Sequence, residues 1–144
     1  MDIIYIKYND NEYEFIYNLK KEVYMDYIIK YFNEYNDEVQ REMFNKRIND
    51  IKDNTYIIYY KGIRVGFYTI KEYTDYIEIE NICILKEYQG LGIGTKVLKD
   101  ILNINKDIKL QYFKCNPVGK LYKRLGFIPD GENDNHYKMI RKVK

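Results

Sequence analysis

The sequence predicts a single α+β domain over residues 1–144, built around a mostly antiparallel mixed sheet in the order β-α-α-β-β-β-α-β-α-β-β. Three observations predict this class. A chain of 144 residues is long enough for one domain with its own core. Short runs rich in Ile and Tyr, bounded by polar or glycine-containing turns, are typical of strands. Between some of these runs, apolar residues recur at helical spacing.

The first third of the chain combines one strand with two helices. Residues 3–8 are predicted as a strand, and the polar run at residues 9–11 ends it and can cap a helix. The helix continues to about Phe32 through apolar residues at helical spacing, namely Phe15, Leu19, Val23 and Tyr27. A polar break separates it from a second helix, for which Asp37 and Gln40 form a capping box.

The rest of the chain completes the sheet. A three-strand antiparallel meander is predicted at residues 55–60, 63–70 and 76–84. After it come a glycine-rich loop, a third helix, a strand, a short helix with Pro117 in its first turn, and a final hairpin. These elements occupy residues 90–94, 96–102, 108–113 and 118–125, and the hairpin strands lie at 127–128 and 137–140.

Charge and hydropathy argue against nucleic-acid and membrane partners. The net charge is +2 and no long basic run appears, whereas phosphate neutralisation needs a concentrated basic face. No apolar stretch approaches the length of a membrane span, and residues 1–5 lack the basic start of a signal peptide. We therefore expect a cytoplasmic protein.

Cysteine and histidine usage points to neither a disulfide nor a metal. Cys83 and Cys115 are interpreted as reduced thiols, and no His/Cys cluster is available to hold a metal ion. His136 is the single histidine of the chain. It follows a polar stretch at residues 131–135, so we predict that it is a surface loop residue.

The most informative segment is the glycine-rich loop at residues 90–94. A strongly strand-like run precedes it and a helical run follows it. Glycines let the backbone approach a ligand closely, and the first free N–H groups of a helix point at an anion. The loop therefore predicts a ligand that carries phosphate.

Two common phosphate loops do not fit this spacing. A P-loop needs Lys followed by Ser or Thr after its last glycine, whereas Gly94 is followed by Thr95 and then Lys96. A dinucleotide loop needs G-x-G-x-x-G and a later acidic residue for the ribose. Here the third glycine comes one residue early, and no following strand ends in a suitable carboxylate.

The spacing from Gln89 to Gly94 instead resembles the Q/R-x-x-G-x-G/A loop of the GNAT (GCN5-related) N-acetyltransferases. A second block, Asn-Pro-Val-Gly-Lys-Leu-Tyr-Lys-Arg-Leu-Gly-Phe at residues 116–127, resembles the "N…LY.K.GF" segment of the same family. The two blocks occur in the family's order and at its usual separation. The resemblance covers the chain from about Thr55 to the C-terminus, and it implies a GNAT-like domain.

The resemblance implies acetyl-CoA as the cosubstrate, with no metal. Carried over by position, the backbone of one strand would pair with the pantetheine arm, provided that the fourth and fifth strands separate at a bulge near Asn81. The loop N–H groups would hold the pyrophosphate, and Lys120 and Lys123 would meet the anionic end. The implied CoA-binding residues are Ile82, Cys83, Ile84, Gln89, Gly90, Leu91, Gly92, Ile93, Gly94, Thr95, Asn116 and Lys123.

The resemblance also implies a catalytic residue. Tyr122 matches the family tyrosine that protonates the leaving CoA sulfur, and a phenol of ordinary pKa about 10 is protonated at neutral pH. The general base stays open between Glu80, Glu78 and neither, because both residues also fit a solvated sheet face. Cys83 has no evident histidine partner that would make it a nucleophile.

The acceptor would lie against the first two helices. Acidic and aromatic residues lie together there: Glu34, Asp37, Glu38, Glu42, Tyr31, Tyr35 and Phe44. Such a surface would suit a cationic amine, or it is simply a solvated helix face.

We expect an acetyltransferase that moves an acetyl group directly to a primary amine, on a small molecule or peptide, in a ternary complex. The alternative is a non-catalytic acyl-CoA-binding or regulatory domain on the same fold. An edge strand near the C-terminus is a candidate for pairing in a homodimer.

Overall fold

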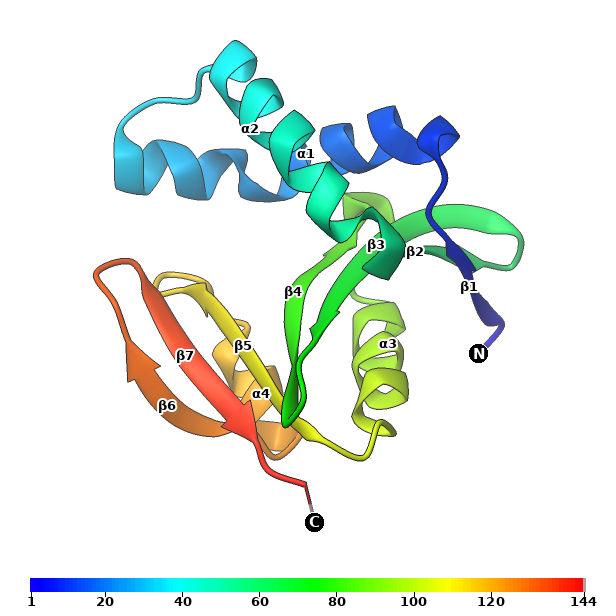
Figure 1. Cartoon of the computed structure of the whole chain (residues 1–144), viewed down its shortest axis with the longest axis vertical. Coiled ribbons are helices and arrows are strands. Elements are labelled where there is room, and N and C mark those ends of the chain that lie inside the picture. The colour runs from blue at the N-terminus through cyan, green and yellow to red at the C-terminus, as the bar shows by residue number, and fades with distance from the viewer. Residues whose placement is uncertain (144) are drawn as a thin grey trace.

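The computed structural model describes residues 1–143, in which one seven-stranded sheet is covered by helices on both faces (Figure 1). The order of elements is the one that the sequence predicts, so that prediction is confirmed. The strands are β1 (Ile3–Lys7), β2 (Thr55–Tyr60), β3 (Ile63–Glu72), β4 (Tyr76–Ile84), β5 (Asp107–Phe113), β6 (Ile128–Glu132) and β7 (His136–Arg141). The helices are α1 (Tyr13–Phe32), α2 (Asp37–Ile51), α3 (Ile93–Leu102) and α4 (Gly119–Arg124).

The sheet is mixed, as predicted, with the strand order β1-β2-β3-β4-β5-β7-β6. Over residues 1–143, β4 and β5 are the one parallel pair, and every other pair is antiparallel. Parallel neighbours need a crossover connection, and α3 supplies it between β4 and β5. The glycine-rich loop lies at the start of that crossover.

The sheet divides between β4 and β5. Their pairing includes only the first three residues of β4, and its last pair is Glu78 with Lys109. Beyond this pair the two strands diverge, so the sheet has one arm of β1 to β4 and another of β5, β7 and β6 (Figure 1). The predicted separation of the fourth and fifth strands is therefore confirmed.

The divergence coincides with a β-bulge in β4. Thr69 of β3 is opposite Asn81, but the next residue, Ile70, is opposite Ile79, so Glu80 is the extra residue. A bulge bends its strand and increases the local twist. It confirms the irregularity that we expected near Asn81.

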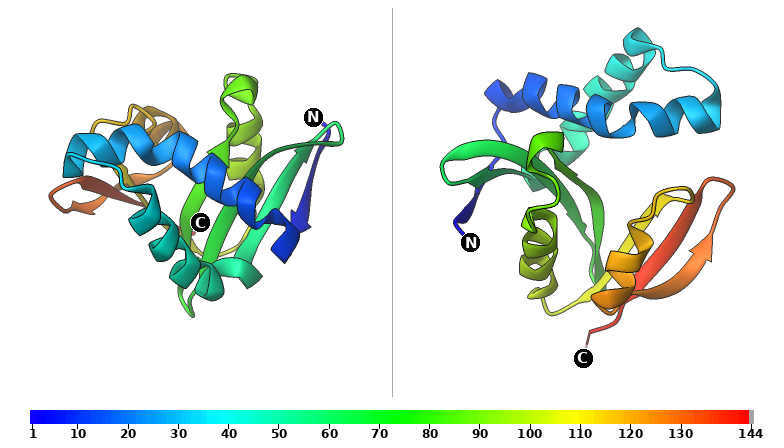
Figure 2. Two further views of the ribbon diagram at one scale, coloured as in Figure 1. Left: turned by 90° about the horizontal axis from the view of Figure 1, so that it is seen from above. Right: turned by 180° about the vertical axis from the view of Figure 1, so that it is seen from behind.

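Two hydrophobic clusters occupy the two faces of the sheet. One packs α3 and α4 on the face seen from behind in Figure 2, and it includes Ile77, Ile79 and Val97. The other packs α1 and α2 on the opposite face, and it includes Ile16, Phe44 and Cys83. Along β4, side chains therefore point to alternate faces, except at the bulge.

The start of α2 differs from the prediction. Asn36, and not Asp37, is the N-cap, and its side-chain oxygen accepts a hydrogen bond from the Val39 N–H at 3.1 Å. Asp37 instead accepts hydrogen bonds from Tyr17 and Lys21 of α1, at 2.7 and 3.0 Å. These side chains join the two helices, an arrangement that a capping pattern cannot reveal.

The exposed edge near the C-terminus is β6. It carries Pro129, which has no N–H to donate, and its pairing with β7 contains an irregularity between Pro129 and Glu132. Both features discourage the addition of another strand. Pairing into a homodimer stays a prediction.

Within residues 1–143, every helix is too short or too polar to cross a membrane. The same residues contain no group of three His, Cys, Asp or Glu side chains arranged to bind a metal ion. The expected cytoplasmic location stays a prediction.

Gly66 of β3 provides a test of how closely β3 and β4 approach. A Cβ at this position would lie 2.3 Å from the Cys83 carbonyl oxygen, which is backbone and cannot rotate away. We predict that Gly66→Ala lowers the free energy of unfolding by about 1–3 kcal/mol, measured by urea denaturation. Gly94→Ala is the control, because a Cβ there meets nothing within 4 Å, and alanine favours a helix by about 1 kcal/mol. An unchanged midpoint for Gly66→Ala would contradict the expected clash.

Candidate functional site

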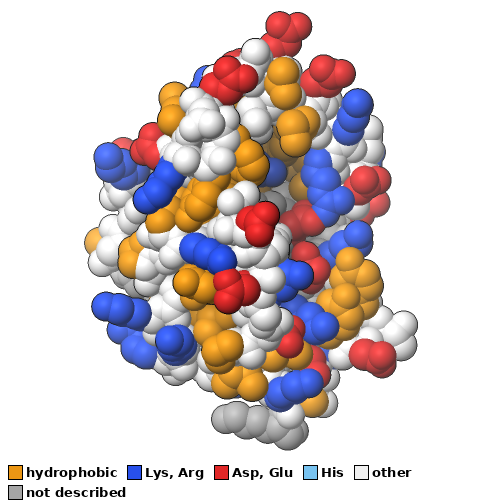
Figure 3. All heavy atoms as spheres, turned by 90° about the vertical axis from the view of Figure 1, so that its left-hand side faces the viewer, with side chains coloured by type: hydrophobic (Ala, Val, Ile, Leu, Met, Phe, Trp, Pro, Cys, Tyr) orange, Lys and Arg blue, Asp and Glu red, His pale blue; other side chains and the backbone are white. Residues whose placement is uncertain are grey.

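A cavity of about 580 Å³ lies where α1 and α2 cover the division of the sheet. Its walls come from α1, α2, the bulged part of β4, the end of β5, the segment leading into α4, and the start of β7. The face shown in Figure 3 is hollowed, and Lys or Arg side chains there lie among Asp and Glu side chains. The cavity reaches residues from both arms of the sheet.

Four of the residues selected from the sequence line this cavity, namely Glu80, Ile82, Asn116 and Tyr122. They come from β4, from the loop after β5 and from α4, so the fold brings together segments far apart in the chain. The other residues that were assigned to catalysis or CoA binding do not line it: Glu78, Cys83, Ile84, Lys123 and the loop from Gln89 to Thr95. Lys123 is exposed on α4.

Among the described residues, the backbone of β4 beyond Glu78 has no partner strand on the side of β5. Backbone N–H and C=O groups along that edge are free to pair with an extended ligand, as an edge strand does. At the end of the edge, the Gln89 side chain donates a hydrogen bond to the Ile84 carbonyl at 3.0 Å. Gln89 thereby ties the start of the glycine-rich loop to the end of β4.

The glycine-rich loop has the geometry of an anion site. Gly90 and Gly92 have φ of 80° and 86°, in the left-handed region that favours glycine. The Lys96 N–H bonds to the Gly92 carbonyl at 3.0 Å, so the three N–H groups before it have no partner within the helix. A Cβ at Gly90 or Gly94 would meet nothing within 4 Å, which leaves open space above the loop.

The structure places the start of α3 three residues earlier than the sequence predicted, at Ile93. Gly94 and Thr95 therefore belong to the first helical turn and not to the loop. The positive end of the helix dipole and the free N–H groups coincide at this turn, a combination that favours a phosphate group. The predicted role of the segment is consistent with this arrangement and stays a prediction.

Asn116 and Tyr122 are positioned by one short segment. The Asn116 side-chain oxygen accepts a hydrogen bond from the Val118 N–H at 3.1 Å, and this turn leads into α4. The Tyr122 ring then packs at 5.6 Å from Tyr112 and 5.7 Å from Phe127, measured between centroids. Pro117 lies two residues before α4 and not in its first turn.

The Tyr122 phenol is held in its protonated form. Burial, with smaller contributions from the neighbouring Cys83 and Tyr112, raises the pKa of Tyr122 to about 12. A proton on this oxygen is therefore present throughout the physiological range. Such a group can donate a proton to a forming anion in the cavity.

Glu80 and Glu78 occupy different surroundings. Glu80 lines the cavity and forms an ion pair with Arg47 of α2 through one carboxylate oxygen. Its second oxygen is buried and has no hydrogen-bond partner among the described residues. Glu78, before the bulge, is aligned with Lys71 of β3 and Lys109 of β5. Of the two candidate bases, only Glu80 therefore reaches the cavity, and its role stays a prediction.

Cys83 is unsuited to nucleophilic attack. Its side chain is buried in the cluster under α1 and α2, and burial raises its pKa to about 12. A thiol in such surroundings carries almost no thiolate at neutral pH. This favours direct transfer over a covalent cysteine intermediate.

The position of His136 corrects the prediction of a surface loop. His136 is the first residue of β7, is partly buried, and packs in a tilted arrangement at 4.3 Å from Phe113, measured between ring centroids. Burial lowers its pKa from the usual value. The polar residues before it form the turn, but β7 already pairs with β5 at His136. It lines the cavity.

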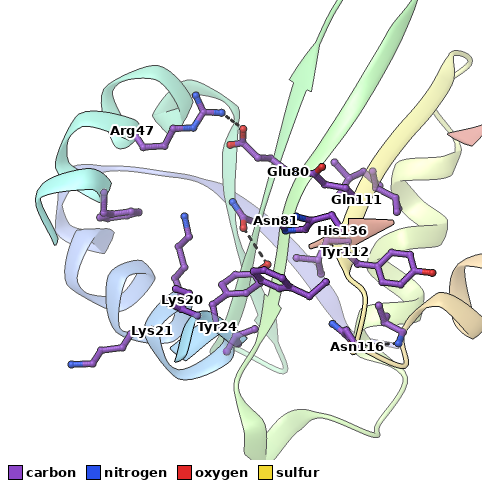
Figure 4. A pocket seen from close by; sticks show the side chains of 18 of the residues that line it. Lys20, Lys21, Tyr24, Arg47, Glu80, Asn81, Gln111, Tyr112, Asn116 and His136 are labelled. Atoms are coloured by element: carbon purple, nitrogen blue, oxygen red, sulfur yellow. Dashed lines mark hydrogen bonds and ion pairs between the residues drawn. The ribbon is translucent and has the colours of Figure 1, made fainter. Parts of the chain in front are cut away.

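Several cavity residues were missed in the sequence because their partners are far away along the chain. Tyr24 of α1 donates a hydrogen bond to the Asn81 side-chain oxygen at 3.2 Å, and Arg47 of α2 reaches Glu80 (Figure 4). Lys20 of α1 also lines the cavity. Lys20 and Tyr24 are four residues apart and thus share one helix face, the one signal that could have grouped them.

The acidic surface expected on α1 and α2 does not line the cavity. Glu34, Glu38 and Glu42 are exposed and lie outside the cavity wall. The Asp37 carboxylate accepts a hydrogen bond from Tyr17 and forms an ion pair with Lys21. Tyr35 and Phe44 do line it, as expected for an acceptor wall. The charged residues that these helices contribute are instead basic, namely Lys20, Lys21 and Arg47.

The Arg47–Glu80 pair gives a stability prediction. Arg47→Met removes the counter-ion of a carboxylate whose side chain is only 20% exposed, so we expect a loss of about 1–2 kcal/mol in the free energy of unfolding. The double variant with Glu80→Gln should recover part of the loss, measured as the coupling in a double-mutant cycle. Additive effects would contradict the pairing. Lys46→Met, exposed on the same helix, is the control.

Thiol reactivity gives a second prediction. Cys115 is exposed and Cys83 is buried with its pKa raised to about 12, so a thiol reagent at pH 8 should modify one cysteine quickly and the other only on unfolding. Cys115→Ser should abolish the fast phase. Rapid modification of Cys83 in that variant would contradict its placement.

Solved structures with the same fold cover nearly the whole chain. PH1933 from Pyrococcus horikoshii OT3 matches with a TM-score of 0.77 and 18% identity over 99% of each chain. The PaiA N-acetyltransferase from Thermoplasma acidophilum was solved with coenzyme A. It matches with a TM-score of 0.70 and 21% identity, over 99% of this chain and 100% of its own. Naa50 from Arabidopsis thaliana was solved with the bisubstrate analogue CoA-Ac-MVNAL. It matches with a TM-score of 0.68 and 20% identity, over 99% of this chain and 100% of its own.

The family is shown by the sequence itself. No curated protein matches the chain. A family model described as the acetyltransferase (GNAT) domain matches residues 52–129, which is more than half of the chain. This segment includes the bulged strand, the glycine-rich loop and Tyr122, which are the features described above. The chain therefore belongs to the GNAT acetyltransferase family.

Proposed function

We propose that the protein transfers an acetyl group from acetyl-CoA directly to a primary amine within a ternary complex. The observation that carries this proposal is the division of the sheet. It exposes the free edge of β4 and opens into a cavity where the protonated Tyr122 meets the wall formed by α1 and α2. Family membership supports acetyl transfer, and the related PaiA and Naa50 structures contain CoA or a CoA analogue.

The donor would bind along the division. The free N–H groups at the start of α3 would receive the pyrophosphate, and the open space above Gly90 and Gly94 would admit it. The pantetheine arm would extend along the unpaired edge of β4 at Ile82. Asn116 would meet the same arm from the opposite side, because its amide nitrogen is not used in the turn with Val118. Lys123 and Lys120 are exposed cations that we assign to the anionic end of CoA.

The acceptor would enter beneath α1 and α2, on the opposite face of the sheet from α3. Its neutral amine attacks the thioester carbonyl, a C–N bond forms, and the C–S bond breaks. The amine proton leaves to Glu80, directly or through water, and Tyr122 gives its proton to the departing sulfur. A backbone N–H at the free edge of β4, near Cys83 or Ile84, would stabilise the oxyanion.

The loss of the Tyr122 hydroxyl tests this mechanism. We predict that Tyr122→Phe lowers kcat about 100-fold or more, because general acid catalysis typically contributes that much, while acetyl-CoA binding is retained. The assay is CoA release with a panel of amines. Because the pKa of Tyr122 is raised to about 12, its proton should not limit the wild-type rate between pH 8 and 10.

The control is Tyr73→Phe, since Tyr73 stacks on Tyr76 in the β3–β4 hairpin and does not line the cavity. It should retain the wild-type rate. Tight acetyl-CoA binding without transfer to any amine would instead favour a non-catalytic acyl-CoA-binding domain. A Tyr122→Phe enzyme with unchanged kcat would remove the tyrosine from the mechanism.

A further inference from the structure

Within residues 1–143, one cation on the proposed acceptor side of the cavity has no counter-ion. Arg47 is paired with Glu80 and lies 3.8 Å from Asp50, and Lys21 is paired with Asp37 at 3.0 Å. Lys20 forms no ion pair and no hydrogen bond with any residue in the described part of the chain. Figure 4 shows Lys21 pointing away from the cavity, whereas Lys20 points toward Arg47.

The surroundings of Lys20 are poorly hydrated. Its ammonium group lies 5.7 Å from the centroid of the Phe44 ring, and its side chain is partly buried in the cavity wall. Burial, together with the nearby positive charge of Arg47, lowers the pKa of Lys20. An ammonium group that has lost water without gaining a counter-ion is unfavourable, and an anion bound in the cavity would remove this cost.

Asn81 adds a neutral donor to the wall of the same cavity. Tyr24 donates its hydroxyl proton to the Asn81 side-chain oxygen, which fixes the orientation of the amide. The amide nitrogen then lies on the side facing Lys20 (Figure 4). An ammonium group and an amide N–H₂ on one wall are donors suited to the two oxygens of a carboxylate.

We propose that the acceptor amine also carries a carboxylate, which Lys20 and the Asn81 amide bind. This inference rests on the proposed acetyl transfer. The second carboxylate oxygen of Glu80, next to Asn81 in the bulge, is buried without a hydrogen-bond partner among the described residues, and we assign the amino group to it. Glu80 and Lys20 would thus recognise the two ends of an amino acid. A polyamine would bring a second positive charge to a wall in which the charge of Lys20 already lacks a counter-ion among the described residues.

The first experiment compares acceptors that differ only in one group. A series of ω-amino acids of increasing chain length is assayed against the matching ω-amino amides and diamines, with acetyl-CoA saturating. We expect at least one amino acid to exceed its amide and its diamine about tenfold or more in kcat/KM, mostly through KM. Lys20→Met, which keeps a long apolar side chain without the charge, should abolish the preference. Lys30→Met is the control, because Lys30 is exposed on the same helix outside the cavity.

The second experiment does not need turnover. The N-acetyl derivatives of the same amino acids and amides are titrated into the wild-type protein and both variants, with CoA present, and the side-chain NMR signals of lysine are followed. We expect binding of the carboxylates but not of the amides, with a rise in the pKa of Lys20. The Lys30→Met protein should behave as wild type, and the Lys20→Met protein should bind carboxylates no better than amides.

The two proposals fail in different ways. Transfer to amines with no carboxylate preference, or a preference that survives in Lys20→Met, would overturn the inference and leave acetyl transfer intact. The absence of transfer to any amine would overturn the proposed function, and the NMR titration would still decide whether Lys20 binds carboxylates. A wild-type protein that binds the N-acetyl amides as well as the carboxylates would overturn the inference directly.

Discussion

The early end of pairing between β4 and β5 is the constraint on which the rest of the site depends. Neighbouring parallel strands normally satisfy each other's backbone N–H and C=O groups along their length. Here the pairing stops at Glu78, just before the bulge at Glu80. Unpaired backbone inside a protein is costly unless water or a ligand satisfies it. The division therefore leaves a free strand edge, to which we assign the pantetheine arm, and it opens the sheet between its two faces.

The bulge also determines which side chains meet. Ile79 and Ile82 both pack toward α3 and α4, so the two residues between them face α1 and α2. There Glu80 meets Arg47, and Asn81 meets Tyr24. A regular strand would send one of these two side chains to the opposite face. One extra residue thus places an acid and an amide side by side in the cavity wall.

The two ends of the site differ in how they hold charge. At the donor end, backbone N–H groups and a helix dipole provide positive potential without a titratable group. At the proposed acceptor end, side chains from two helices provide it, and burial lowers the pKa of one of them, Lys20. Tyr122 is partly buried and its pKa is raised to about 12, so it stays neutral at physiological pH, as the proposed proton donor requires.

The sequence by itself determined the order of elements, the glycine-rich loop before α3 and the place of Tyr122 in α4. These features are local: glycine spacing, helical periodicity and turn residues act over a few neighbours, so they are readable along the chain. Tertiary structure alone decided that Glu80 is paired with Arg47, that Glu78 lies outside the cavity, and that His136 belongs to a strand. It also decided between the two alternatives for the acidic residues of α1 and α2, because Glu34, Glu38 and Glu42 are solvated and the charged residues that these helices place in the cavity wall are basic. Such pairings join residues tens of positions apart, and they depend on helix docking and strand register, which no local pattern records.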